Sequence, residues 1–251
     1  MEKGTVIRTA ATVEVGDTVE IKAADFEALL AWSPRPGSAY TVEAKGESFR
    51  ARLVELHEDR ASLFVFERMP GAAESPVEIV LLQALPSRER MELIIEKATE
   101  LGVDMIVPFR AEKGIDLEER ESSQKKAHKW PDRAKKAAKQ CRRARIPTIA
   151  PFMSMEEAMR FAEDADMKIM LLESAGRHLK DLLKGAGKSL KVCILSGPEG
   201  GFAEDEVALA RDHGFVPVSL GARILRTETA AIVGAALVQY ELGDLGGMKR
   251  A

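Results

Sequence analysis

From residue 77 onward, short apolar runs alternate with segments of helical spacing, and this alternation limits the possible fold more than any other feature of the sequence. The apolar runs are VEIVLLQAL (77–85), VDMIVPF (103–109), MKIMLLE (167–173), LKVCILS (190–196) and FVPVSL (215–220). Runs rich in Val, Ile and Leu with helices between them are typical of a mostly parallel sheet covered on both faces. The sequence therefore predicts an α/β domain, and ligands of such domains bind beyond the carboxyl ends of the strands.

Three segments, two between these runs and one after the last of them, show clear helix signals. SRERMELIIEKATELG (87–102) places its apolar residues on one face and ends at Gly102, a C-cap position. SMEEAMRFAED (154–164) carries a capping box formed by Ser154 and Glu157. TETAAIVGAALVQYEL (227–242) is apolar over most of its circumference. Such a helix is usually buried in a core or at a subunit interface.

Residues 1–69 follow a different pattern. Five short β-like runs, GTVIR, TVEIKA, AYTVEA, SFRARLVEL and ASLFVFE, are separated by turn clusters such as SPRPGS and HEDR. We expect a small antiparallel barrel or sandwich here. The stretch PGAAESP (70–76) has the composition of a linker. The sequence thus predicts two domains, residues 1–72 and residues 73–251.

Composition narrows the cellular setting. The 251 residues are 45% hydrophobic and 31% charged, which is typical of a globular protein with an ample core. Cys141 and Cys193 have no metal-ligand spacing and suit a reducing cytosol without disulfides. No signal peptide is evident, and the longest apolar stretch (230–238) falls short of the ~20 residues of a membrane span. We therefore expect a cytoplasmic protein without membrane segments or metal.

Positive charge is concentrated in one segment. Residues 125–145 contain 10 Lys or Arg residues against the single acidic Asp132, whereas residues 1–70 contain 9 basic and 12 acidic residues. A local excess of this kind indicates either a polyanion-binding surface or the solvated face of a helix. The charge count alone leaves both readings open.

Three strands run into similar loops, ESAGR (173–177), SGPEGG (196–201) and GARILRTE (221–228). The second lies in LSGPEGGF, which lacks the Lys-Ser/Thr pair of a P-loop and the glycine spacing of a dinucleotide fingerprint. NTPase and dehydrogenase functions therefore gain no support. Because parallel strands end at one sheet edge, we expect the three loops to converge on a binding site that includes Arg226 and Glu228.

Three motifs together resemble the ribosomal small subunit methyltransferase E family. They are GPEGGFAEDEV (197–207), SLGARILRTETA (219–230) and EKATELGVD (96–104). The resemblance covers residues 77–251 well and the front domain loosely. It implies a SPOUT-type α/β domain with a trefoil knot, a PUA-like front barrel that binds RNA, and methylation of N3 of one uridine in 16S ribosomal RNA of the small subunit.

The same resemblance implies S-adenosylmethionine as the cofactor, bent into a pocket made by the three loops. This cofactor has no phosphate, so a P-loop lysine is not needed. Apolar side chains would line an adenine slot, and glycines would let the chain pass close to the ligand. The cofactor-binding residues expected on this basis are Leu172, Glu173, Leu195, Ser196, Gly197, Gly200, Gly201, Leu220, Gly221, Leu225 and Thr229.

Methyl transfer from a sulfonium needs alignment of the reacting atoms rather than a metal. Loss of the N3 proton leaves negative charge on the uracil, which a cation near its carbonyl oxygens would stabilise. Arg226 is the first candidate for that role. Glu228 or Glu199 would accept the proton, or would only orient a loop.

The basic segment also gains a role from the resemblance. Trp130, Ala134, Ala137 and Cys141 form an apolar stripe with Ala127, and cations project elsewhere. Such a helix suits an RNA backbone. The RNA-binding residues expected here are Lys129, Arg133, Lys136, Arg142 and Arg143. Relatives pair through the knotted domain, so a homodimer is expected as well.

Some positions depart from the family pattern. Ser33 lies where the front domain usually carries an arginine, the preceding stretch ADFEALLAW lacks the usual paired histidines, and Arg142 follows Gln140-Cys141 where a glycine is usual. These departures affect RNA docking and target identity rather than the methyl-transfer loops. Two alternatives therefore stay open: a methyltransferase acting on another RNA site, and a non-catalytic RNA-binding ribosome-assembly factor.

Overall fold

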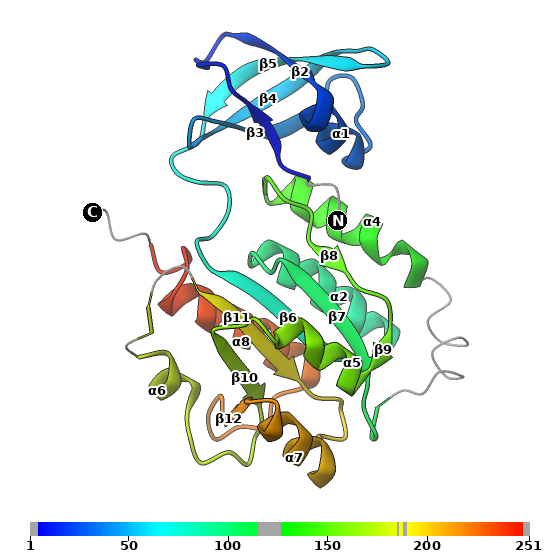
Figure 1. The fold of residues 1–251 in the computed structure, drawn as a ribbon, viewed down its shortest axis with the longest axis vertical. Coiled ribbons are helices and arrows are strands. Elements are labelled where there is room, and N and C mark those ends of the chain that lie inside the picture. The colour runs from blue at the N-terminus through cyan, green and yellow to red at the C-terminus, as the bar shows by residue number, and fades with distance from the viewer. Residues whose placement is uncertain (1–4, 115–126, 185, 188–189, 248–251) are drawn as a thin grey trace. The chain divides into compact units, whose positions relative to one another are not determined.

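The computed structural model describes residues 5–114, 127–184, 186–187 and 190–247. The chain divides into two compact units (Figure 1). The first unit comprises Met1–Glu74 with Lys135–Ile146, and the second comprises Ser75–Ala134 with Pro147–Ala251. Each unit encloses hydrophobic residues of its own.

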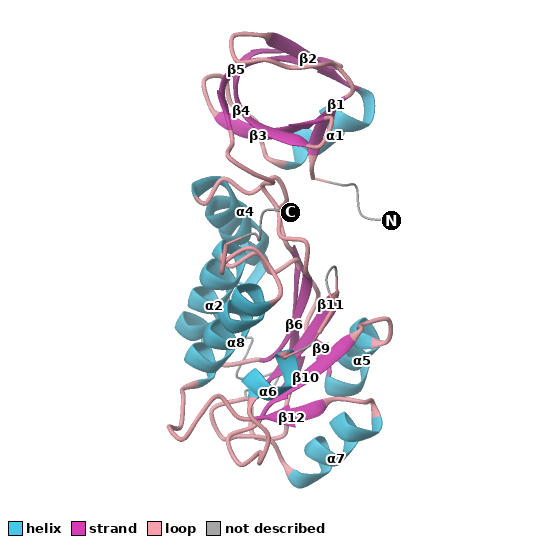
Figure 2. Cartoon of the chain, turned by 90° about the vertical axis from the view of Figure 1, so that its left-hand side faces the viewer, coloured by secondary structure: helices cyan, strands magenta, loops and turns pink. Residues whose placement is uncertain are grey.

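The first unit is built on a five-stranded sheet. Its order is β1 (Ile7–Thr9), β3 (Ala39–Ala44), β4 (Glu47–Leu56), β5 (Arg60–Arg68) and β2 (Thr18–Lys22). Each run predicted as a strand contains one, although β1 shares only Ile7 and Arg8 with the run GTVIR. The neighbours are antiparallel except for β1 and β3, whose parallel pairing was not predicted. Figure 2 shows the strands curving around the interior of the unit.

A helix that the sequence analysis did not predict, α1 (Ala23–Ala31), follows β2 directly. Phe26 and Leu29 are one turn apart and are both buried in the core of the first unit. The segment AADFEALLA is rich in strong helix formers, so local propensity and packing agree. The helical spacing of Phe26 and Leu29 was present in the sequence, but one such pair among several predicted strands was too short to predict a helix.

The short helix η1 (Ala127–Lys129) leads into α4 (Trp130–Gln140), within which the two units divide. Trp130 and Ala134 belong to the core of the second unit, and Ala138 belongs to the core of the first. After α4, Arg142 adopts φ +66°, and the Arg143 amide donates to the carbonyl of Ala138 at 3.0 Å. This pattern is a Schellman cap, in which glycine is favoured at the left-handed residue.

The second unit contains a parallel sheet. Its order is β12 (Val216–Val218), β10 (Met167–Leu171), β11 (Lys191–Ser196), β6 (Glu78–Ala84), β7 (Met105–Arg110) and β8 (Thr148–Ile149), with β9 (Met153–Ser154) also paired to β7. Each of these strand pairs is parallel. The predicted α/β fold with a mostly parallel sheet is therefore confirmed.

Helices cover both faces of this sheet (Figure 2). On β6, Ile79 and Leu81 pack in one cluster with residues of α2 (Arg88–Glu100), α6 (Leu179–Leu183) and α8 (Thr227–Glu241). Val80 and Leu82 pack in the other with residues of α5 (Met155–Met159), η2 (Arg160–Ala162) and α7 (Glu204–Asp212). Successive strand residues point to opposite faces, so two covered faces require the near-continuous apolar runs of the sequence.

Two of the predicted helix signals are confirmed. Ser154 accepts a hydrogen bond from the amide of Glu157, whose side chain accepts one from the amide of Ser154, as in a capping box. Gly102 follows α2 with φ +80°. The amide of Val103 then donates to the carbonyl of Ala98 at 3.0 Å, which closes the C-terminal end of the helix.

The apolar helix α8 has two different sides. Its inner side is closely packed: a Cβ added to Gly234 would lie 3.0 Å from Cδ1 of Leu171. On its outer side, Leu237 and Tyr240 are exposed, Tyr240 by 59%. The helix thus contributes to the core while retaining apolar surface that nothing in the described part of the second unit covers.

Candidate active site

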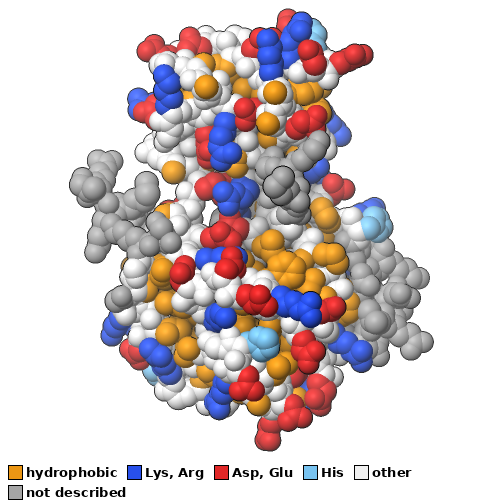
Figure 3. Space-filling model, in the orientation of Figure 1, with side chains coloured by type: hydrophobic (Ala, Val, Ile, Leu, Met, Phe, Trp, Pro, Cys, Tyr) orange, Lys and Arg blue, Asp and Glu red, His pale blue; other side chains and the backbone are white. Residues whose placement is uncertain are grey.

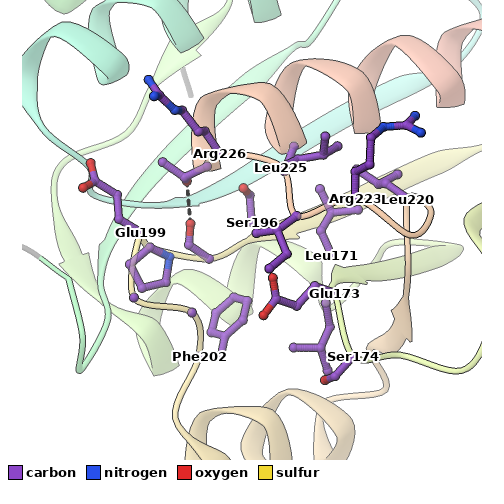
Figure 4. A pocket seen from close by; sticks show the side chains of 18 of the residues that line it. Leu171, Glu173, Ser174, Ser196, Glu199, Phe202, Leu220, Arg223, Leu225 and Arg226 are labelled. Carbon is purple, nitrogen blue, oxygen red and sulfur yellow. Dashed lines mark hydrogen bonds between the residues drawn. The ribbon is translucent and has the colours of Figure 1, made fainter.

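A cavity of about 540 Å³ lies beyond the carboxyl ends of β10, β11 and β12 (Figure 4). This volume is in the range of small-molecule sites. Its lining comes chiefly from the three loops that follow these strands, together with residues of α2 and α8. The strands are neighbours in the order β12, β10, β11, so parallel pairing brings their loops to one edge.

Most of the expected cofactor residues line this cavity, and Arg226 does as well. They are Leu172, Glu173, Ser196, Gly197, Gly200, Gly201, Leu220, Gly221 and Leu225. Leu195 and Thr229 are not part of the lining. Leu195 is fully buried among the α5 and α7 residues, because it points to the opposite side of β11 from Ile194.

The glycine loop after β11 follows a path that larger residues would obstruct. A Cβ on Gly197 would lie 2.8 Å from the ring of Phe202, which is itself largely buried and lines the cavity. Gly201 adopts φ +72°, where side chains are strained. These two glycines therefore set the course of the loop and let Phe202 lie against it.

A buried hydrogen-bond relay fixes this loop to its neighbours. The hydroxyl of Thr227, at the start of α8, donates to the carbonyl of Gly197 at 2.6 Å. The same oxygen accepts from Nε2 of Gln83, on β6, at 3.1 Å. Ser196 lines the cavity beside the relay, and its buried hydroxyl has no protein partner. Because buried hydroxyls are nearly always hydrogen-bonded, Oγ of Ser196 is a polar atom available to a ligand.

Charged groups surround the opening of the cavity. Figure 4 shows Glu199 and Arg226 at one end of the pocket and Arg223 at the other. Arg90, from the first turn of α2, forms an ion pair with Glu199, and its Nε lies 3.6 Å from Oε2 of Glu228. One guanidinium thus joins the glycine loop to the first turn of α8. Arg226 has no carboxylate within 4.0 Å among the described parts of the chain.

Several lining residues escaped the sequence analysis. Arg90 and Lys113 are far in sequence from the three loops, and Lys113 donates weakly to the carbonyl of Phe202 at 3.5 Å. Phe202, Arg223 and Thr227 lie inside or next to the motifs. Two of them could have been predicted from the sequence, because an aromatic residue after a glycine-rich loop often packs against that loop and a threonine at the start of a helix often hydrogen-bonds to a neighbouring backbone. The positions of Arg90 and Lys113 required the tertiary structure.

The residues expected to bind RNA fall into two groups. Lys129 and Lys136 are exposed and have no carboxylate partner in the described residues. Arg133 is within 2.6 Å of Glu92, and Arg142 is within 3.1 Å of Glu67. Arg143 is 5% exposed and holds Glu74 at 2.7 Å. The structure therefore already engages Arg133, Arg142 and Arg143 within their own units.

Other classes of site have few candidate residues. In the part of the chain that is described, no three His, Cys, Asp or Glu side chains gather as metal ligands. Within the same residues, the helices are too short or too polar to cross a bilayer. Cys193 is buried in β11, and burial raises the pKa of its thiol, with smaller effects of neighbouring charges.

Comparison with known proteins adds independent findings. Residues 73–239 match the family model of an RNA methyltransferase domain. The chain is 28% identical to ribosomal RNA small subunit methyltransferase E of Bacillus subtilis, over 80% of this chain and 81% of the relative. It is 31% identical to the protein of that name from Buchnera aphidicola, over 78% and 76%. In structure it resembles ribosomal RNA small subunit methyltransferase E from Neisseria gonorrhoeae bound to S-adenosyl methionine, with a TM-score of 0.68, 30% identity and 95% and 98% coverage.

Proposed function

The chain belongs to the ribosomal RNA small subunit methyltransferase E family, and from this premise we infer that it uses S-adenosylmethionine to methylate N3 of a uridine in 16S ribosomal RNA. The observation that carries the inference is the cavity at the ends of β10, β11 and β12, formed by the family's own motifs. The similar N. gonorrhoeae protein has a solved structure with this cofactor bound.

The residues of the cavity fit such a cofactor. Its apolar wall, which includes Leu172, Leu220 and Leu225, suits the adenine ring. The glycine loop brings backbone groups to the ligand without side-chain obstruction. The unpartnered hydroxyl of Ser196 offers a hydrogen bond to a polar group of the ligand. When bound, S-adenosylmethionine supplies an activated methyl group.

The chain's own groups would then handle the uridine. Arg226 donates hydrogen bonds to a uracil carbonyl oxygen and stabilises the negative charge that develops as the N3 proton leaves. Its lack of a carboxylate partner in the described structure supports this role. Glu228 or Glu199 accepts the proton. Arg90 holds both carboxylates and so sets their positions.

The resemblance extends the proposal to the whole chain. Residues 1–72 form a PUA-like barrel domain, and residues 73–251 form a trefoil-knotted domain. The protein acts in the cytoplasm. Lys129 and Lys136, which have no carboxylate partner among the described residues, contact the RNA backbone, with Arg133, Arg142 and Arg143 holding the basic segment in place.

The exposed apolar side of α8, with Leu237 and Tyr240, pairs with a second copy. Light scattering at micromolar concentration should give twice the mass of one chain, and an active monomer would contradict this pairing.

The deciding experiment is transfer of a radiolabelled methyl group from S-adenosylmethionine to small ribosomal subunits that lack this modification, followed by mapping of the labelled base. We expect label on N3 of one uridine. Arg226→Ala should abolish transfer while cofactor affinity changes by less than about tenfold, or ~1.4 kcal/mol. Arg211→Ala removes an exposed arginine from α7, outside the cavity, and is the matched control.

Each other outcome has a defined meaning. Label on another RNA atom would reject the uridine-N3 assignment but keep the methyltransferase. Cofactor and RNA binding without transfer would favour the assembly factor. Normal turnover of the Arg226→Ala variant would remove that residue from the mechanism.

A further inference from the structure

Three basic side chains of the first unit, on two separate elements, have no acidic partner in the described structure and lie close enough for their charges to interact. Elsewhere in this unit, Arg8 pairs with Glu43, Arg60 with Glu20, Arg68 with Glu47, Arg142 with Glu67 and Arg143 with Glu74. Accordingly, basic and acidic side chains are intermixed over the face drawn in Figure 3. Arg35, Lys135 and Lys139 have no carboxylate within 4.0 Å in the described structure. We call these three residues the basic cluster.

Two separate elements hold the basic cluster together. Lys135 and Lys139 are one turn apart on α4, so their side chains share a face of the helix. Arg35 lies in the loop between α1 and β3, and its backbone amide donates to the hydroxyl of Tyr40 at 3.1 Å. In the same loop, Ser33 adopts φ +51° and accepts a hydrogen bond from Nζ of Lys135 at 3.0 Å. The loop and the helix are thus tied to each other through polar contacts.

The cluster rests on a fixed aromatic base. Nζ of Lys139 lies 5.3 Å from the ring centroid of Tyr40, within cation–π range. The rings of Tyr40 and Trp32 meet edge to face at 6.5 Å, and Nε1 of Trp32 donates to the carbonyl of Thr5 at 2.7 Å. Both rings are almost completely buried. The cations therefore project from a rigid surface.

This arrangement concentrates positive charge at a cost. Burial lowers the pKa of Lys139, and the charges of Lys135 and Arg35 lower it further. Like charges one helical turn apart oppose helix formation. A bound anion would offset both effects, because it would neutralise the cations and satisfy their remaining donors.

We propose that Arg35, Lys135 and Lys139 form a binding site for backbone phosphates of the RNA substrate, with the Ser33 hydroxyl as an additional donor; this rests on the proposed function of the chain. The chemistry favours the backbone over the bases. Lys ammonium and Arg guanidinium groups are phosphate ligands, whereas Tyr40 and Trp32 are too deeply buried to stack on a base. Contacts of this kind position an RNA without selecting its sequence.

The test uses the full chain and a fragment of 16S ribosomal RNA, with affinity measured over a range of salt concentrations. Each lost phosphate contact lowers the slope of log affinity against log salt by about 0.7–0.9. The triple variant Arg35→Ala, Lys135→Ala, Lys139→Ala should therefore lose about 2 from the slope, and about a hundredfold in affinity at ~0.1 M salt. Its cofactor affinity should match that of the native protein, since all three changes lie in the first unit.

A matched control removes the same charge from the same unit. Lys22, Arg60 and Arg68 are exposed and lie near carboxylates, so their triple Ala variant should retain the native slope. Equal losses in both triple variants would mean that only net charge matters and would overturn the site. An unchanged slope in the cluster variant would do the same.

Two further measurements distinguish the loss of phosphate contacts from unfolding of the variant and from a failure of the proposed function. If the triple variant unfolds, the single surface changes Arg35→Ala and Lys135→Ala should each lower the slope by about 0.8. A native slope in both would reject the site. If the native protein neither binds nor methylates the RNA, the proposed function itself fails, and the basic cluster loses its assigned ligand with it. Native methylation with an unaffected cluster variant would overturn only the phosphate site.

Discussion

Replacing Thr227 by valine should loosen the glycine loop from the body of the second unit. Thr227 is 6% exposed, and its hydroxyl donates to the carbonyl of Gly197 at 2.6 Å and accepts from Nε2 of Gln83 at 3.1 Å. Valine has nearly the same shape but can make neither bond. At ~1 kcal/mol for each bond, and with a carbonyl left poorly satisfied, the second unit should lose about 2–3 kcal/mol.

Thr227→Ser is the matched control. It keeps the hydroxyl and removes one methyl group, which should cost about 1 kcal/mol. Thr227→Val should also weaken binding of S-adenosylmethionine several-fold, because the relay positions the loop that lines the cavity. The serine variant should bind it nearly normally.

The chain offers a convenient probe for this measurement. It has two tryptophans, Trp32 in the core of the first unit and Trp130 in the core of the second. In a Trp32→Phe background, fluorescence during urea unfolding reports on the second unit alone. Equal stability of the valine and serine variants would show that the hydroxyl relay does not stabilise the loop, and would refute the reasoning.

Three further predictions concern single positions. Gly197→Ala should destabilise the second unit by about 1–3 kcal/mol and weaken cofactor binding, because its Cβ would lie 2.8 Å from Phe202. Calorimetry should detect both effects, and it should detect neither for Gly176→Ala, whose Cβ meets nothing within 4 Å. Arg142→Gly should stabilise the first unit by about 0.5–1 kcal/mol in thermal unfolding, because glycine adopts the φ of +66° without strain and the lost ion pair is exposed. Arg142→Ala keeps the backbone strain and should not stabilise the unit, so equal effects of the two changes would contradict the strain argument. A thiol reagent at pH 8 should modify Cys141 and leave Cys193 unreacted until denaturant is added, because burial raises the pKa of Cys193; two rapidly reacting thiols would disprove this.

The parallel sheet was predictable because both of its faces are covered. That arrangement forces continuous apolar strands such as 77–85, and these are visible without an alignment. The convergence of the three loops followed from the same premise. Arg90 was not predictable, because it reaches the cavity from α2, more than a hundred residues before Glu199 and Glu228. Sequence periodicity describes elements and carries no information on which helix end faces which strand end.

The basic segment illustrates a second limit. Its excess of cations was evident, but the sequence does not reveal which of them already have partners. Arg143 lies against Glu74, about seventy residues earlier, and the pair is largely buried. Lys135 and Lys139, which the sequence analysis did not single out, are left without acidic partners in the described structure, as are Lys129 and Lys136. Partner choice depends on tertiary distance, so charge counts locate a basic surface only to the nearest segment.

The division of the chain within α4 has a consequence for protein synthesis. The first unit requires Ala138 for its core and Arg143 to pair with Glu74, and its two pieces are separated by the 60 residues Ser75–Ala134 of the second unit. A ribosome making about 5–20 residues per second would need roughly 3–12 s before the second piece begins to follow the first. During that interval the nascent amino-terminal strands lack part of their interior. Such a chain should depend on chaperones that bind the emerging segments. A fragment cut at the linker should fail to fold, because residues 1–74 alone lack the second piece of the first unit.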